Sequence, residues 1–226
     1  MLRIFQIWFD EQSKRNCFQH PAVTLHHNQK LTAYFENQVI LDLRPYTDPY
    51  VGVWSHKAGQ KLPRAANPQF SIDRLVEICE VGGFDVLGFH HMHGRQTILY
   101  DQVRVKYNAM FDYLMRRMGL SYSSKVNPRF NVLQNHFIAR SEIMNDYTDF
   151  LARAVEIMES DRELKAELNS PAPYRPESGR VYPYHPFVCE KLVSAYLHLK
   201  PEIVCTFYKR REASLFGPRV KASRAG

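Results

Sequence analysis

Two segments in the second half of the chain carry polar side chains that could bind a ligand or move a proton. Residues 134–140 include Asn135 and His136, and residues 184–192 include His185 and Glu190. In each segment, the polar groups stand beside an apolar run where an extended stretch is expected to meet a helix. Ligands bind at such junctions in open α/β sheets. We therefore take all four as candidate site residues.

These candidates have different expected roles, and each has a structural alternative. Glu190 lies in an apolar helix, where a carboxylate can act as a general base, and His185 is the second candidate base. Glu190 could equally pair with an arginine or lie on the solvated face of its helix. Asn135 and His136 are expected to bind substrate, unless a local hydrogen-bond network satisfies them in a buried strand.

The residues after Trp54 include side chains that could bind an anion. Lys57 can meet a phosphate as a point charge, and Ser55 can donate a hydrogen bond to it. The alternative is a solvated loop. His91 shares one face of an extended segment with His93, which leaves a metal site one or two ligands short. We therefore expect His91 to bond a diphosphate, and we expect no metal site. The alternative is that these histidines lie at the polar end of a strand and form hydrogen bonds with backbone or solvent.

The composition indicates which partners and which cellular compartment we expect for the protein. The net charge of +7 favours an anionic partner, and no nucleic-acid-binding motif or dense basic stripe is present within residues 1–208. We therefore do not expect nucleic acid as a partner. The four cysteines form no CxxC pair and indicate reduced thiols in a cytoplasmic protein. No segment reaches transmembrane length, and the N-terminus does not resemble a signal peptide.

The hydrophobic pattern predicts alternating strands and helices. Strands are expected at residues 2–9, 50–54, 84–89, 132–139 and 203–208, and helices at residues 31–43, 72–80, 101–118, 142–159 and 186–199. Residues 10–30, the stretch after residue 54 and residues 169–185 are expected to be loops. This alternation predicts a single α/β domain over residues 1–208, with a mostly parallel sheet flanked by helices.

The last eighteen residues form a separate basic tail. Residues 209–226 hold six lysines and arginines against one acid, Glu212. Such a segment buries too little apolar area to offset its ordering entropy, so we expect a mobile tail. It is either a solvated end or a peripheral contact with an anionic membrane at the inner face.

Several familiar catalytic signatures are absent from the sequence. It has no glycine-rich dinucleotide or P-loop motif and no GxSxG elbow. It also has no Asp-x-Asp at a predicted strand end, the usual means by which an α/β transferase holds Mg²⁺ against a diphosphate.

Short motifs along most of the chain resemble a family of bacterial proteins encoded with polysaccharide-biosynthesis enzymes. They are residues 4–11, 34–37, 50–57, 135–140 and 185–192. The last two also resemble capsular-polysaccharide glycosyltransferase-like proteins. The resemblance implies a GT-A-like fold and transfer of a sugar from a nucleotide-sugar donor to a saccharide or lipid-linked acceptor. Without Asp-x-Asp, it implies either metal-independent catalysis, in which Lys57, Arg95 and histidines neutralise the diphosphate, or a catalytically inactive fold.

Three functions remain open on the sequence. The leading one is a glycosyltransferase-like enzyme in which Glu190 or His185 takes the acceptor proton and basic groups stabilise the leaving diphosphate. The second is a non-catalytic nucleotide- or protein-binding partner of polysaccharide-assembly enzymes. The third, a nucleic-acid-binding module, is suggested by charge alone. In each case we expect no cofactor, and a divalent metal is not favoured.

Overall fold

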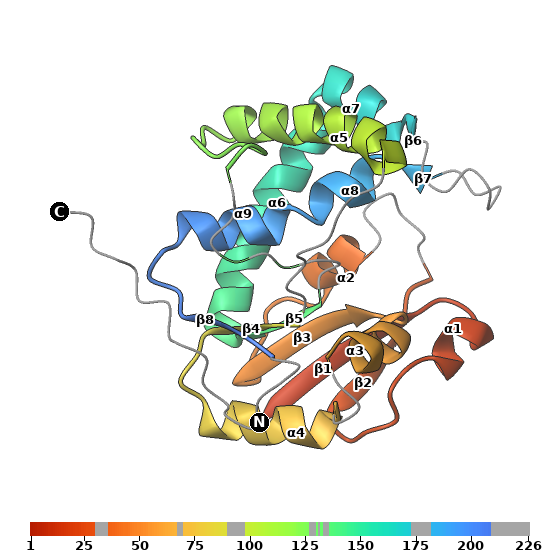
Figure 1. Cartoon of the computed structure of the whole chain (residues 1–226), viewed down its shortest axis with the longest axis vertical. Coiled ribbons are helices and arrows are strands. Elements are labelled where there is room, and N and C mark those ends of the chain that lie inside the picture. Colours follow the sequence, from red (N-terminus) through yellow and green to blue (C-terminus); the bar gives the residue numbers. More distant parts are fainter. Residues whose placement is uncertain are drawn as a thin grey trace.

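The computed structural model contains a mixed six-stranded sheet, and helices cover both faces of this sheet (Figure 1). The structure describes residues 1–29, 36–66, 70–89, 98–126, 130, 132, 136–172 and 182–208. The basic tail predicted at 209–226 lies outside these residues. The described residues confirm an α/β fold with helices on both faces of the sheet.

Five of the six strands run in one direction. The spatial order is β2 (Val23–His27), β1 (Leu2–Trp8), β3 (Tyr50–Ser55), β5 (Phe137–Arg140), β4 (Val86–Gly88) and β8 (Cys205–Phe207). β5 is antiparallel to β3 and β4, whereas every other neighbouring pair is parallel. The predicted mostly parallel sheet is therefore confirmed, with one strand reversed near its middle.

The alternation of side chains along the central strands divides the hydrophobic core in two. On β3, Tyr50 and Trp54 point to one face, and Val51 and Val53 point to the other. This is the two-residue period of an extended chain. Because both faces are apolar, β3 is buried along its whole length and must lie between two layers of helices.

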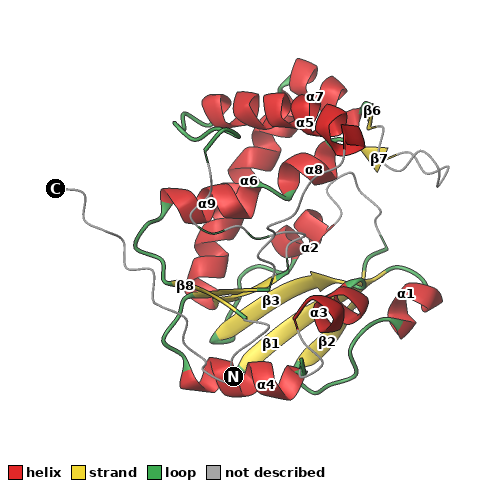
Figure 2. Ribbon diagram, in the orientation of Figure 1, coloured by secondary structure: helices red, strands yellow, loops and turns green. Residues whose placement is uncertain are grey.

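The two helical layers differ in size (Figure 2). The smaller layer contains α3 (Ala58–Ala66) and α4 (Ile72–Val81). The larger core contains side chains of α2 (Glu36–Asp42), α5 (Ile98–Arg117), α6 (Ser141–Ser160), α8 (His185–Cys189) and α9 (Leu192–Leu199). α7 (Arg162–Asn169) and the short ladder of β6 (Pro171–Ala172) with β7 (Tyr182–Pro183) add to this layer.

Local sequence signals account for several helix ends. The Ser71 hydroxyl accepts a hydrogen bond from the Arg74 amide at 3.1 Å and caps α4. Gly119 follows α5 with φ of 73°, a conformation that favours glycine. Ser141, in contrast, is the first helical residue of α6 and not its cap, because Arg140 precedes the helix.

Several predictions were wrong, and one of them is the loop at residues 169–185, which contains β6 and β7. Residues 10–29 contain α1 (Glu11–Arg15) and the edge strand β2, and the presumed loop after residue 54 contains α3. β2 has only half-buried apolar residues on an exposed edge, so its hydrophobic signal is weak. The predicted helix 186–199 is interrupted after Cys189, where the Lys191 amide bonds the Val188 carbonyl and tightens the turn.

Candidate functional site

The carboxyl edge of the sheet brings together residues from distant parts of the sequence. β1 ends at Trp8 and β3 at Ser55, while the reversed strand β5 begins at the same edge with Phe137. The residue before it, His136, therefore lies beside Ser55. Ser55 Oγ and His136 Nε2 are 3.3 Å apart, and both residues are buried. The structure thus unites two of the predicted substrate-binding residues.

A glycine and a tryptophan set the spacing between β3 and β5. The indole Nε1 of Trp54 donates a hydrogen bond to the Phe137 carbonyl at 2.9 Å. A Cβ on Gly52 would lie 2.9 Å from that indole nitrogen, so only glycine leaves room for it. The buried Gln6 amide also donates to the Ser55 carbonyl at 3.3 Å. These contacts fix the backbone that carries Ser55 and His136.

Two lysines follow β3 one helical turn apart. The Lys57 carbonyl accepts from the Lys61 amide at 2.9 Å, so Lys57 and Lys61 share a face at the start of α3. The helix lies against the loop after α1, because the Gln60 side chain donates to Asn16 at 2.8 Å. At Gly59, an added Cβ would lie 1.9 Å from the Asn16 carbonyl oxygen. Gly59 therefore permits the position from which both lysines project.

Two carboxylates from the larger helical layer share the electrostatic environment of these lysines. Glu190 follows α8, Glu36 begins α2, and both side chains are half-buried. Burial raises the pKa of Glu190 to about 7, with a further increase from Glu36 and an opposing effect of Lys61 and Lys57. Burial also raises the pKa of Glu36, while its own backbone amide and the lysines oppose that shift.

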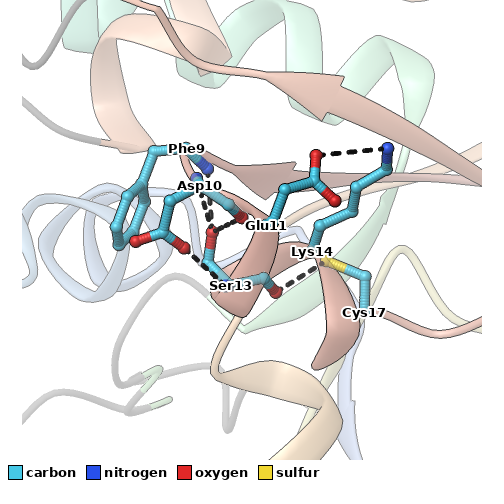
Figure 3. Close-up of polar contacts among 6 residues, drawn as sticks. All are labelled: Phe9, Asp10, Glu11, Ser13, Lys14 and Cys17. Atoms are coloured by element: carbon cyan, nitrogen blue, oxygen red, sulfur yellow. Dashed lines mark hydrogen bonds and ion pairs between the residues drawn. The ribbon is translucent and has the colours of Figure 1, made fainter.

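The turn after β1 forms the next part of this edge (Figure 3). Asp10 Oδ1 accepts from the Ser13 amide at 2.6 Å, and Ser13 Oγ accepts from the Asp10 amide at 2.9 Å. This reciprocal capping box starts α1 and fixes Phe9, whose ring lies edge-on to His56 at 4.9 Å. Burial and the nearby Lys57 lower the pKa of His56, while Asp10 opposes the shift.

His185 lies in different surroundings from Glu190, although both were predicted as candidate bases. It is buried, and its ring interacts with the Leu168 backbone, Glu159 and Lys165, which belong to the α6–α7 region. Burial lowers its pKa. The charged neighbours of Glu190 are instead Glu36, Lys57 and Lys61. Of the two candidates, Glu190 is thus the one electrostatically linked to the lysines after β3.

Three predicted site residues cannot be placed. His91, Arg95 and Asn135 lie outside the described residues. Within the described ranges, no group of three His, Cys, Asp or Glu side chains is arranged to hold a metal ion. The same ranges contain no helix that is long and apolar enough to cross a membrane.

Glu36 and Lys61 complete the charge cluster, and neither was predicted as a site residue. The four-residue spacing of Lys57 and Lys61 would have placed both on one face, had α3 been recognised as a helix. No sequence spacing links Glu36 to these lysines, because Glu36 reaches the cluster only through tertiary packing of α2. We call Glu36, Glu190, Lys57 and Lys61 the charged cluster.

Comparison with known proteins returned no match: no family model, no curated protein and no solved structure resembles the chain closely enough to be reported. We therefore infer function from the geometry of the site and from the sequence motifs.

Proposed function

We propose that the protein is a GT-A-like glycosyltransferase of cell-surface polysaccharide biosynthesis. It would move a sugar from a nucleotide-sugar donor to a saccharide or lipid-linked acceptor. A mostly parallel sheet with polar residues at its carboxyl edge is compatible with this class. The resemblance of short sequence motifs to those of polysaccharide-biosynthesis proteins supports the choice of substrate class. The charged cluster supplies groups suited to the chemistry.

In the proposed reaction, an acceptor hydroxyl oxygen attacks the anomeric carbon of the donor sugar. The bond from that carbon to the phosphate oxygen breaks, and its electron pair leaves with the nucleoside diphosphate. Lys57 and Lys61 would stabilise the negative charge that develops there. Glu190 would accept the hydroxyl proton as general base. Ser55 and His136 would hold the donor beside these groups.

One observation carries the proposal. Glu190, with a pKa raised to about 7, shares the electrostatic surroundings of two lysines that follow a central strand. A general base works best when its pKa lies near the working pH, because it is then both available and strong enough to accept a proton. An ordinary surface glutamate has neither that pKa nor such neighbours.

A donor screen followed by an activity assay tests this proposal. Thermal shift against UDP-, GDP-, CMP- and dTDP-sugars should identify a donor that stabilises the protein by about 2.7 kcal/mol at a hundred times its dissociation constant. Transfer or slow hydrolysis of that donor should then be measurable. We expect activity to survive EDTA; complete loss restored by Mn²⁺ or Mg²⁺ would replace the lysine-based mechanism with a metal-dependent one.

Binding without turnover would support a different function. If a nucleotide sugar binds but is neither hydrolysed nor transferred to any acceptor, the chain is better explained as a non-catalytic nucleotide-binding partner of polysaccharide-assembly enzymes. Failure of every nucleotide sugar to bind would contradict both functions.

A further inference from the structure

A serine hydroxyl and a histidine imidazole meet at the carboxyl edge of the sheet. Ser55 is the last residue of β3, His136 directly precedes β5, and Ser55 Oγ lies 3.3 Å from His136 Nε2. When His136 carries its proton on Nδ1, its Nε2 accepts a hydrogen bond from the Ser55 hydroxyl. In this arrangement an imidazole can activate a serine as a nucleophile.

Buried contacts hold the backbone on both sides of this pair. Gln6 is fully buried in β1, where its side-chain nitrogen donates to the Ser55 carbonyl at 3.3 Å and its side-chain oxygen accepts from the Phe18 amide at 2.8 Å. The Trp54 indole donates to the carbonyl of Phe137, the residue after the histidine, at 2.9 Å. Such fixed geometry matters to a nucleophile and its base, because a misplacement of about 1 Å can cost about 10²-fold in rate.

The chain turns from β3 into α3 directly after Ser55. The Lys57 carbonyl is the first acceptor of this helix, so the amides of Ala58 and Gly59 have no acceptor within it. Negative charge that develops near these amides is stabilised by the positive end of the helix dipole. Exposure also rises along this turn, from Ser55 at 6% through half-buried His56 to exposed Lys57. The serine therefore lies where β3 approaches the surface.

We propose that Ser55 and His136 act as a nucleophile and a general base that cleave carboxylic esters through an acyl-Ser55 intermediate. Ser55 Oγ attacks the ester carbonyl carbon while its proton moves to His136 Nε2. That proton passes to the alcohol oxygen as the bond between this oxygen and the carbonyl carbon breaks. A water molecule, deprotonated by His136, then attacks the acyl carbon, and the carboxylic acid leaves as the proton returns to Ser55 Oγ.

This activity goes beyond the proposed sugar transfer, in which both side chains only hold the donor. It requires no nucleotide, so the two activities can be tested separately. His56 is the competing base, because it is adjacent to Ser55 in the sequence. Its ring lies edge-on to Phe9 at 4.9 Å, whereas the imidazole at hydrogen-bond distance from the serine belongs to His136.

A fluorophosphonate probe tests the pair directly. Attack by Ser55 would form a bond between Oγ and phosphorus and expel fluoride, and the hydroxyl proton would go to His136. At about pH 8, where an ordinary imidazole is neutral, intact-mass spectrometry should show a single adduct that peptide mapping places on Ser55. Labelling should slow at about pH 5, where an ordinary imidazole is protonated. The wild-type protein should also hydrolyse p-nitrophenyl acetate.

Four variants identify the groups responsible. Ser55→Ala should lose both the adduct and the ester hydrolysis. His136→Gln should be labelled about 10²–10⁴-fold more slowly, as expected when a general base is removed. His56→Gln should be labelled like the wild type. Ser160→Ala, which removes an exposed hydroxyl on α6, is the matched control. If His136→Gln does not fold, the pH dependence of wild-type labelling tests the role of the imidazole.

Several results would overturn the inference. They are the absence of an adduct, an adduct on another residue, and undiminished ester hydrolysis by Ser55→Ala. Labelling of folded His136→Gln at the wild-type rate, or a loss confined to His56→Gln, would also contradict it. A purely structural hydrogen bond between Ser55 and His136 predicts variants that melt at a lower temperature and no adduct in the wild type. Because no nucleotide sugar is present, none of these results depends on whether the protein transfers sugar.

Discussion

The two edges of the sheet hold charged residues in opposite ways. At the amino edge, charges are matched: Arg140 Nε lies 3.2 Å from Asp85, and Arg3 Nε lies 3.7 Å from Asp48. At the carboxyl edge, Glu36, Glu190 and Lys57 form no ion pair within the described part of the chain, although their charges influence one another. Paired charges hold a fold together, whereas charges with shifted pKa values and no direct partner are typical of binding sites.

Asp85 illustrates the structural type of charge. Besides its contact with Arg140, it accepts a hydrogen bond from the Val204 amide at 2.7 Å, so it ties the start of β4 to the end of β5 and the start of β8. Asp85 has no role in the proposed chemistry. We therefore assign stability to the amino edge of the sheet and ligand chemistry to its carboxyl edge.

The largest expected effect is loss of transfer in Glu190→Gln. Removing a general base should lower kcat by about 10²–10⁴-fold, because no group remains to take the acceptor proton. The neutral amide should also remove the cost of a half-buried charge, so the variant should melt at the same or a higher temperature at neutral pH. Glu156→Gln, which alters an exposed carboxylate on α6, is the matched control. Full activity in Glu190→Gln would eliminate its role as base.

A second prediction concerns the amino edge. Asp85→Ala should lower the free energy of unfolding by about 3 kcal/mol, since Arg140 and the Val204 amide both lose an acceptor. Urea denaturation measures the loss. Nucleotide binding by the folded fraction should be unchanged. A variant that is stable but no longer binds nucleotide would break the proposed division between the edges.

The pH dependence of stability offers a third test. The folded state raises the pKa of Glu190 to about 7, so the folded protein keeps a proton that the unfolded chain releases near its ordinary pKa. This contribution to stability is present below about pH 4.5 and is lost as the pH rises to about 7, by on the order of 2 kcal/mol. The difference between wild type and Glu190→Gln isolates it. An equal difference in stability at acid and neutral pH would contradict the shift.

The smallest expected effect concerns the position of α3. In Gly59→Ala, the added methyl would meet the Asn16 carbonyl, and the helix would have to shift with Lys57 and Lys61. We expect a loss of about 1 kcal/mol in stability and a few-fold weaker nucleotide binding. Gly119→Ala is the control, because its Cβ meets nothing within 4 Å and only backbone strain remains. Equal binding by both variants would show that α3 does not position the lysines.

The sequence was most informative where an element has a continuous or regular apolar pattern. β1 and β3 are apolar on both faces, and α6 presents a regular apolar stripe, so composition and period alone predicted all three. α3 was missed because Pro63 and its basic residues suggested a loop, although Ala58 and Leu62 are buried one turn apart. β2 was missed because an exposed edge strand needs few apolar residues.

The site was predictable only where strand ends define it. Ser55 was expected to follow the strand at residues 50–54 and His136 to lie within the strand at 132–139, whereas β5 begins only at Phe137 and its reversal brings the two side chains together. The direction of β5 within the sheet cannot be predicted from the sequence of its four residues. Glu36 joins the charged cluster through the packing of α2, and His185 is turned toward α7 by the short helix that separates it from Glu190. Contacts between residues distant in the sequence determine where Glu36 and His185 lie, and these contacts cannot be predicted from the local sequence pattern.

The central claim is that ligands bind at the carboxyl edge of the sheet. Nucleotide binding by variants that lack a charge at one edge or the other tests this claim most directly. Isothermal titration with the best nucleoside diphosphate would compare wild type, Lys57→Met with Lys61→Met, and Arg3→Met, which removes a cation at the amino edge. The carboxyl-edge variant should bind at least about tenfold more weakly, as expected when two charge-assisted contacts are lost. The Arg3→Met variant should bind like the wild type. Equal affinity in all three proteins, or a loss confined to Arg3→Met, would contradict the assignment of ligand binding to the carboxyl edge.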